Sequence, residues 1–325
     1  MTERHDEATS KIQQDAPLNR QLLHDRPGRT FFSNDDTRWG ELILPAAHEN
    51  PQKTEQGLRV LLIASMPLGY AAVRTVTEYE RRNSDRLNLV ALVTDDPINP
   101  DAKIGIKKRF WKYFEPEERL RIETASVEAA LMSGVPVYTG EVKIDWFRAQ
   151  ADKWRPDAII VCAFGQVIDR NLIDLPPYGI YNCHPSDLAH DLGAGLAPYE
   201  NLYERDAATT VWTVHHVAEE VDAGHIVGWS PPVSVRTAAD TLPRKVKLIN
   251  EKMLYPLSYM VYFLIDTLTK KYLAEKPGAV QKIDFESRFP DGVKARLMEP
   301  ISGDGIFRPD FEPDPEMFDL GDSNG

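Results

Sequence analysis

The stretch from Tyr181 to Pro198, YNCHPSDLAHDLGAGLAP, holds an amide, a thiol, two imidazoles, a hydroxyl and two carboxylates. If it begins on a strand, Asn182 and His184 project to the same side, because side chains two residues apart share a face. An amide N–H can donate to a developing oxyanion, and an imidazole can take up and return a proton. This pair suits attack of an amine on a carbonyl carbon. Asp222, in a turn further along the chain, is the candidate carboxylate to support the histidine.

Two other chemistries compete for the same region, because five of the eight histidines lie between residues 184 and 225. Metal binding is less favoured, since no histidine spacing matches a helical metal-binding signature, and His215 and His216 would point to opposite faces of a strand. A Cys183 nucleophile activated by His184 is less favoured for the same geometric reason. Cys183 is instead interpreted as a small core residue that faces away from the site. The sequence predicts no metal site.

Buried-strand patterns alternate with helical patterns along the middle of the chain. This alternation implies βαβ crossovers, and hence an α/β fold with a largely parallel sheet and helices on both faces. Ligands of such sheets bind beyond the carboxyl ends of the strands, so the loops after residues 165, 181 and 217 are the ones to search. The predicted strands are 58–65, 87–96, 135–140, 157–165, 178–186 and 209–217.

Four segments follow from the patterning. Residues 1–56 lack a sustained period and are predicted to be an N-terminal extension. Residues 57–235 carry the strand and helix alternation and are predicted to be the catalytic domain. Residues 236–275 have helical spacing throughout. Residues 276–325 are expected to form an irregular, acidic tail.

Composition narrows the classes of partner. The 325-residue chain has 42% hydrophobic residues and a net charge of −12, which describes a soluble globular protein without the basic footprint of a nucleic-acid binder. No apolar run is long enough to cross a bilayer, and the N-terminus lacks the apolar core of a secretory signal. We therefore expect a cytoplasmic protein with no nucleic-acid or membrane partner. Its two cysteines are expected to be reduced thiols.

Four short motifs in order resemble the folate-dependent formyltransferase family, in particular the N-terminal catalytic domain of methionyl-tRNA and sugar N-formyltransferases. They are an N-x-H pair at 182–184, a G-x-x-P at 195–198, a T-x-H at 213–215 and a D-x-G at 222–224. The resemblance implies a Rossmann-like formyltransferase fold. It also implies an enzyme that transfers a formyl group from 10-formyltetrahydrofolate to an amine.

The resemblance also implies roles for individual residues. Asn182 would stabilise the oxygen of the tetrahedral intermediate, His184 would act as acid and base, and Asp222 would relay protons and order His184. The family seats its folate against the loop after the fourth strand and against the D-x-G loop. The implied folate-binding residues are Phe164, Gly165, Gln166, Val167, Glu220 and Val221.

The acceptor is less well defined. Many family members have the sequence S-L-L-P-x-x-R-G where this chain has SDLAHDLGAG. This difference indicates that the part of the site that contacts the acceptor or the folate differs from theirs. The basic, aromatic stretch KIGIKKRFWKYF at 103–114 could bind a nucleotide diphosphate, and it makes an amino-sugar nucleotide the leading acceptor. The same stretch could instead bind the folate tail or be an exposed basic helix. The candidate substrate-binding residues are Ser186, His190, Gly195, Lys107, Arg109 and Trp111.

Other acceptors and other functions remain possible interpretations of the sequence. Within the family, the acceptor could be the N-hydroxyornithine of a siderophore or a methionyl-tRNA, although the segment after residue 275 is short and acidic for tRNA binding. A 10-formyltetrahydrofolate hydrolase and a folate-binding module without activity are the rivals from other classes. A homodimer is also left open.

Overall fold

A central sheet of ten strands organises the part of the chain that the structure, a computed structural model, describes. The described residues are 20–26, 29–34, 40–46, 49, 53–95, 109–190, 197–274, 285, 287–307 and 309–322. Along the sheet the strand order is β1-β2-β3-β6-β5-β4-β7-β8-β10-β11. The strands are β1 (Arg20–Arg26), β2 (Arg29–Asn34), β3 (Gly40–Leu44), β4 (Leu58–Ala64), β5 (Leu87–Thr94), β6 (Val137–Gly140), β7 (Ala158–Cys162), β8 (Ile180–His184), β10 (Thr213–His216) and β11 (Ile226–Trp229). Two short strands, β9 (Thr209–Thr210) and β12 (Val233–Ser234), pair separately.

The middle of the sheet is parallel. Strands β6, β5, β4, β7 and β8 pair in parallel, and antiparallel strands flank them on both sides. The run LNLVALVT of β5 is buried at every position, as expected for a parallel strand covered on both faces. From β4 the chain moves outward to β5 and β6, then returns to the other side of β4 for β7 and β8. The strand order therefore reverses between β4 and β7, where ligands of open α/β sheets bind.

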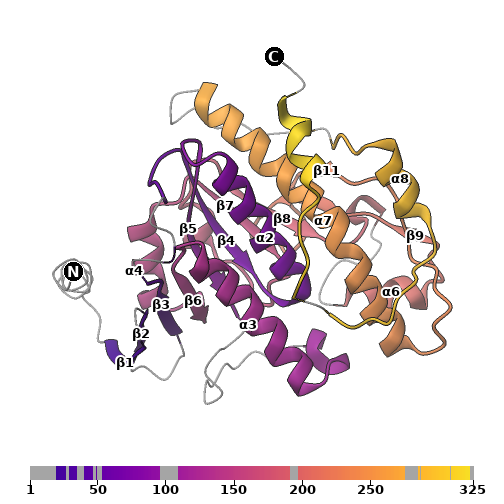
Figure 1. Ribbon diagram of the computed structural model, residues 1–325, viewed down its shortest axis with the longest axis horizontal. Helices are drawn as coiled ribbons and strands as arrows, with labels where there is room; N and C mark the ends of the chain where they lie inside the picture. The colour runs from indigo at the N-terminus through magenta and orange to yellow at the C-terminus, as the bar shows by residue number, and fades with distance from the viewer. Residues whose placement is uncertain are drawn as a thin grey trace.

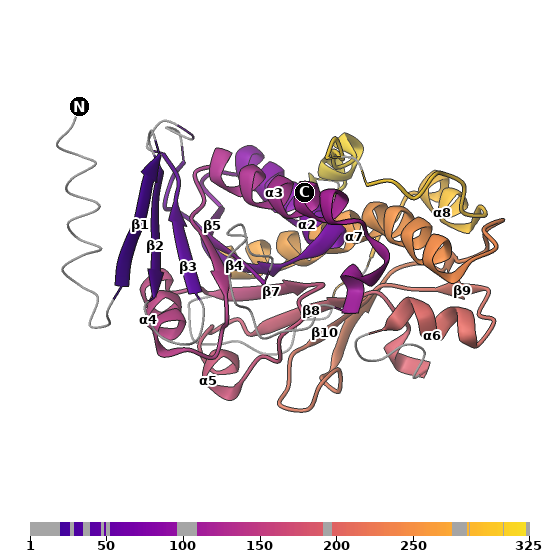
Figure 2. The same cartoon turned by 90° about the horizontal axis from the view of Figure 1, so that it is seen from below.

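Helices cover both faces of the sheet, as the sequence predicts (Figure 2). Helices α2, α3 and α7 pack on one face over a large apolar core, and α4 and α5 pack on the other over a smaller one. The helices are α2 (Met66–Arg82), α3 (Pro116–Met132), α4 (Asp145–Trp154), α5 (Arg170–Ile173), α6 (Pro198–Glu204), α7 (Leu242–Ala274) and α8 (Asp291–Met298), with 3-10 helices η1 (Arg109–Tyr113), η2 (Leu188–His190) and η3 (Pro315–Asp322). Among the described residues, no helix combines the length and apolarity needed to span a membrane.

The N-terminal segment contributes more than an extension. Strands β1, β2 and β3 form an antiparallel meander, and β3 joins the main sheet by pairing with β6, Leu42 opposite Tyr138. Leu42 and Ile43 are buried in the two cores. The sequence reading missed β3 because its partner in the main sheet, β6, lies about a hundred residues further along the chain.

The predicted strand 209–217 is two strands. The chain leaves β9 and enters β10 across Val211 and Trp212, and the Trp212 ring is fully buried. The Trp212 indole N–H donates to the carbonyl of Met253 on α7 at 3.2 Å. This contact with a distant helix interrupts a run that reads as continuous in the sequence.

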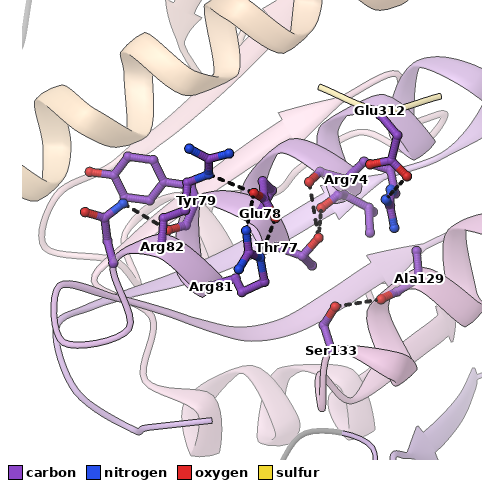
Figure 3. A network of polar contacts seen from close by, with 11 residues as sticks. Arg74, Thr77, Glu78, Tyr79, Arg81, Arg82, Ala129, Ser133 and Glu312 are labelled. Carbon is purple, nitrogen blue, oxygen red and sulfur yellow. Dashed lines mark hydrogen bonds and ion pairs between the residues drawn. The ribbon is translucent and has the colours of Figure 1, made fainter. Parts of the chain in front are cut away.

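The C-terminal residues are more ordered than their acidic composition suggests. We call residues 299–307 and 309–322 the C-terminal strap, which follows α8 and runs over α7 and α2 (Figure 1). The hydroxyls of Tyr255 and Tyr259 donate to Asp314 at 2.6 and 2.9 Å, and Glu312 pairs with Arg74 of α2 (Figure 3). Phe307 and other apolar side chains of the strap are buried. Apolar anchors between the acidic residues thus hold the strap to the helices.

Candidate active site

The predicted catalytic residues lie together at the end of β8. Strands β8 and β10 are antiparallel and place Asn182 opposite His215. The Asn182 Nδ2 atom lies 3.1 Å from His215 Nε2. From the turn after β10, the Asp222 carboxylate reaches both imidazoles, with Oδ2 at 3.5 Å from His184 Nε2 and Oδ1 at 3.7 Å from His215 Nε2. One amide, two imidazoles and one carboxylate therefore share a single site.

His215 is fixed in one neutral tautomer by its partners. Its Nδ1 lies 2.8 Å from the backbone carbonyl of His216, which can only accept, so Nδ1 carries the proton. Nε2 is then an acceptor, and it takes one N–H of the Asn182 amide. Burial lowers the pKa of His215, against smaller opposing effects of the His216 carbonyl and Asp222. A neutral His215 therefore orients the Asn182 amide and leaves its second N–H for another acceptor.

His184 is held from its other side by Ser186. The Ser186 hydroxyl lies 2.8 Å from His184 Nδ1, and both side chains are buried. The backbone carbonyl of Ser186 in turn accepts from Thr213 Oγ1 at 2.7 Å. With Nδ1 occupied in this way, His184 Nε2 faces Asp222 and the cavity. The ring can exchange a proton at Nε2 without losing its orientation.

The turn that carries Asp222 depends on two unusual backbone positions. Asp222 has a φ of 57°, in the left-handed region that aspartate tolerates better than most residues. A Cβ added to Gly224 would lie 1.6 Å from the carbonyl oxygen of His216, so only glycine fits there. The D-x-G pattern is thus explained by local backbone geometry. It brings the Asp222 carboxylate back over the end of β10.

A cavity of about 300 Å³ opens beside these residues. Its walls include Asn182, His184 and Asp222, together with the backbone loop from Phe164 to Val167. Two apolar side chains of the lining, Val167 and Val221, are 49% and 61% exposed. Exposed apolar side chains in the lining of a cavity are suited to a partly apolar ligand.

Buried polar contacts fix the loop between β7 and α5. The Gln166 amide donates to the Gly140 carbonyl at 2.7 Å and accepts from the Val142 N–H at 3.0 Å. The Gly165 N–H donates to Asp95 at 3.1 Å, and the same carboxylate accepts from Ser65 at 2.5 Å. The side chain of Gln166 is therefore used to anchor the loop.

The other predicted ligand-binding residues have different surroundings. Glu220 is exposed and is not among the residues that line the cavity, unlike its neighbour Val221. Ser186 lies behind His184 and positions it. His190 is exposed and pairs with Asp187 at 2.8 Å. The structure thus gives Ser186 a place beside the histidine and puts His190 at the surface.

The basic stretch contributes less to the site than the sequence suggests. The ring of Trp111 is only 5% exposed and packs with Met66, Tyr70 and Phe307, so it belongs to an apolar cluster and is not offered to a ligand. Arg109 begins η1, and its side chain lies outside the described residues. Lys107 and Gly195 also lie outside them.

Two residues of the site were given no role by the sequence reading. His215 belongs to the T-x-H motif, so the signal was present, but its contact with Asn182 depends on the register of β8 against β10. Asp95 directly follows a buried strand at the carboxyl edge of the sheet, where polar residues often serve a site. The position of Asp95 at the end of a predicted strand was the one feature of the sequence that could have indicated its role.

Comparison with known proteins agrees with this geometry. A model of the family "Formyl transferase" matches residues 117–257. The matched residues include the predicted catalytic residues Asn182, His184 and Asp222.

Several relatives with a similar sequence are methionyl-tRNA formyltransferases. One from Geobacillus sp. is 32% identical over 172 residues, which cover 52% of this chain and 49% of the relative. One from Acidobacterium capsulatum is 37% identical over 102 residues, 31% of this chain and 32% of the relative. Among solved structures, a phosphoribosylglycinamide formyltransferase from Anaplasma phagocytophilum matches with a TM-score of 0.49 and 15% identity, over 72% of this chain and 95% of that one. The matches span about a fifth to a half of the length of these relatives.

Proposed function

We propose that the protein is an enzyme that transfers the formyl group of 10-formyltetrahydrofolate to the amine of a small acceptor. The observation that carries the proposal is the convergence of Asn182, His184 and Asp222 on one cavity, within the residues that match the formyl transferase family. Two exposed valines in the cavity lining support the proposal, because they can pack against the flat ring of a folate.

The chain's own groups account for the proton and charge changes of this reaction. The bound folate supplies a formyl group whose carbon joins the acceptor nitrogen while its bond to the folate nitrogen breaks. The free N–H of Asn182 donates to the formyl oxygen as negative charge develops there. His184 takes the proton released by the attacking amine at Nε2 and delivers it to the leaving folate nitrogen. Asp222 stabilises the imidazolium between the two transfers.

The identity of the acceptor remains a prediction. The amino-sugar nucleotide was inferred from the stretch 103–114, of which residues 103–108 lie outside the described part. N-hydroxyornithine stays an alternative. A tRNA acceptor is a second candidate because the relatives similar in sequence are named methionyl-tRNA formyltransferases. These names stand against the expectation that no nucleic acid is a partner.

A transfer assay with a panel of amines tests the proposal. Substituting Asn182→Ala or His184→Ala should lower turnover by about 10²- to 10³-fold, with Asp222→Ala in a similar range, while folate binding persists. Asp174→Ala is the control, because Asp174 is a surface carboxylate paired with Arg170. Wild-type turnover in any one active-site variant would remove that residue from the mechanism.

The same assay separates the rival functions. Release of formate without any acceptor would indicate a hydrolase. Measurable folate binding without product from any amine or from methionyl-tRNA would indicate a binding module. Either result would refute the transferase proposal.

A further inference from the structure

The active-site cavity has a second wall, to which none of the predicted folate-binding residues belongs. Its members are Met66, Leu68, Pro198, Tyr199 and Asn250, and we call them the inner wall. They come from α2, α6 and α7, and both α2 and α7 pack on the opposite face of the sheet from α5 (Figure 2). The predicted folate residues instead lie in the loop between β7 and α5 and in the turn after β10. A folate bound there would leave the inner wall to the second substrate.

Asn250 gives the inner wall an amide whose oxygen is not engaged. Its Nδ2 atom donates to the carbonyl of Val246, one turn earlier on α7, at 2.8 Å, and this contact fixes the amide plane. Among the described residues the amide oxygen has no hydrogen-bond partner, although Asn250 is only 9% exposed. An unpaired acceptor in such a buried position is costly. In the lining of the active-site cavity, this oxygen is suited to the N–H of a bound amine.

Met66 has a strained backbone conformation at the start of α2. Its φ is 66°, in the left-handed region that a bulky residue rarely occupies. Five non-glycine residues of the described chain have a positive φ, and three of them, Met66, Ala163 and Asp222, line the active-site cavity. Backbone strain that gathers at one cavity is typical of a functional site. Met66 also lies two residues after β4, where the strand order reverses and ligands of such sheets bind.

The C-terminal strap supports Met66 from outside the cavity. Met66, Tyr70, Trp111 and Phe307 belong to one apolar cluster, in which the Phe307 ring packs edge-on against the Tyr70 ring. The Tyr70 hydroxyl donates to the Pro309 carbonyl at 2.8 Å, which ties the strap to α2. Phe307 and Pro309 lie beyond the formyl transferase match, which ends at residue 257. The position of Met66 in the inner wall therefore depends on a segment outside that match.

We propose that the inner wall binds the acceptor. The Asn250 amide oxygen accepts a hydrogen bond from the acceptor amine, and the Met66 side chain contacts the carbon skeleton that carries this amine. This inference rests on the proposed formyl transfer. It places the amine within the cavity that Asn182 and His184 also line.

The neighbours of these two residues define the class of acceptor. Leu68, Pro198 and Tyr199 are apolar or aromatic, and all three are buried. A carboxylate on the carbon next to the amine would lose its hydration against such side chains. The acceptor class that follows is a primary amine or hydroxylamine whose adjacent carbons carry no charge. This class includes amino sugars and excludes free α-amino acids.

Asn250→Leu tests the contact with the amine. Leucine has a similar size and favours a helix, but it cannot accept a hydrogen bond. We expect the acceptor KM to rise about three- to tenfold while folate affinity is unchanged. Asn83→Leu is the matched control, because Asn83 Nδ2 also donates to the carbonyl four residues earlier and Asn83 does not line the cavity. A wild-type acceptor KM in Asn250→Leu, or a loss of its folate affinity, would overturn the assignment.

Met66→Ala tests the contact with the carbon skeleton. The probes are leucinamide and alaninamide, two amines that differ in the size of one apolar group. The truncation should raise the kcat/KM of leucinamide relative to alaninamide about tenfold, a change of preference that general destabilisation does not produce. Met132→Ala is the control, because Met132 is 65% exposed on α3 and does not line the cavity. An unchanged preference in Met66→Ala would refute the contact.

A matched pair of acceptors tests the chemical class in the wild-type protein. Leucinamide and leucine share a skeleton, but only leucine has a carboxylate beside the amine. We expect a kcat/KM at least tenfold higher for leucinamide, and equal or better use of leucine would overturn the class. Formyl transfer to any amine with wild-type kinetics in Asn250→Leu would reject the inner wall alone. If the wild-type protein formylates no amine, the proposed function fails and the inner wall fails with it.

Discussion

Replacing His215 by phenylalanine tests how the site controls the Asn182 amide. His215 is 2% exposed, and its neutral Nε2 accepts one Asn182 N–H at 3.1 Å. Phenylalanine keeps the ring in the buried space but cannot accept this hydrogen bond. The Asn182 amide then loses its fixed orientation, although it can still donate to the formyl oxygen in part of the population.

The size of the effect follows from the single contact removed. A neutral hydrogen bond contributes about 0.5–1.5 kcal/mol, which corresponds to a roughly two- to thirteenfold loss of kcat/KM. Complete loss of the oxyanion donor, as in Asn182→Ala, should cost about 10²- to 10³-fold. The His215→Phe loss should therefore be clearly smaller than the Asn182→Ala loss.

Steady-state transfer kinetics measure both variants, with His216→Phe as the control. His216 is the strand neighbour of His215, but its ring packs tilted against the Tyr181 ring, with the centroids 4.5 Å apart, and it does not line the cavity beside Asn182. Its replacement should leave kcat/KM unchanged. Wild-type kinetics in His215→Phe would refute the orienting role, and a loss equal to that of Asn182→Ala would show that His215 takes part in the chemistry itself.

The lowered pKa of His215 also predicts a pH effect on stability. Because the folded state resists protonation of this ring, the unfolded state binds the proton first as pH falls below about 6.5. The wild-type protein should therefore lose unfolding free energy between about pH 7 and pH 5 relative to His215→Phe. Denaturant unfolding at a series of pH values measures the difference, and parallel curves would contradict the neutral buried state.

Ser186→Ala should leave folate affinity unchanged but lower kcat by a few-fold to about tenfold, because His184 loses the partner of its Nδ1; an unchanged kcat would refute the positioning role. Gln166→Leu should weaken folate binding, measured by fluorescence titration, since the loop after β7 loses both anchors to residues 140 and 142; wild-type affinity would contradict this. Burial alone would raise the pKa of Asp314, but hydrogen bonds from two tyrosines outweigh burial and lower it, so Asp314→Ala should reduce unfolding free energy by about 1.5–3 kcal/mol at pH 7, and this difference should start to shrink as pH falls below about 4. Cys162 is fully buried and burial raises the pKa of its thiol, so it should react with a disulfide reagent only in denaturant, and fast labelling of the folded protein would contradict its burial.

Local pattern was enough to predict the core of the fold. The apolar runs of β4, β5 and β7 and the helical spacing of α2 and α7 depend on which side chains are buried, and burial imposes a period that a single sequence reveals. The three N-terminal strands β1, β2 and β3 were not predicted from such a pattern. Strand β3 joins the main sheet by pairing with β6, which lies about a hundred residues further along the chain.

For the site, the sequence alone determined the alternation that aims Asn182 and His184 to one side and the turn chemistry that presents Asp222. The tertiary structure decided which neighbours complete the site. His215 meets Asn182 only because β10 pairs with β8 in one register, and Asp95 reaches the loop after β7 only because β5 and β7 lie on either side of β4. The inner wall likewise exists only where distant segments pack together. Periodicity is a local consequence of burial, whereas contacts across the sheet depend on the packing of the whole chain.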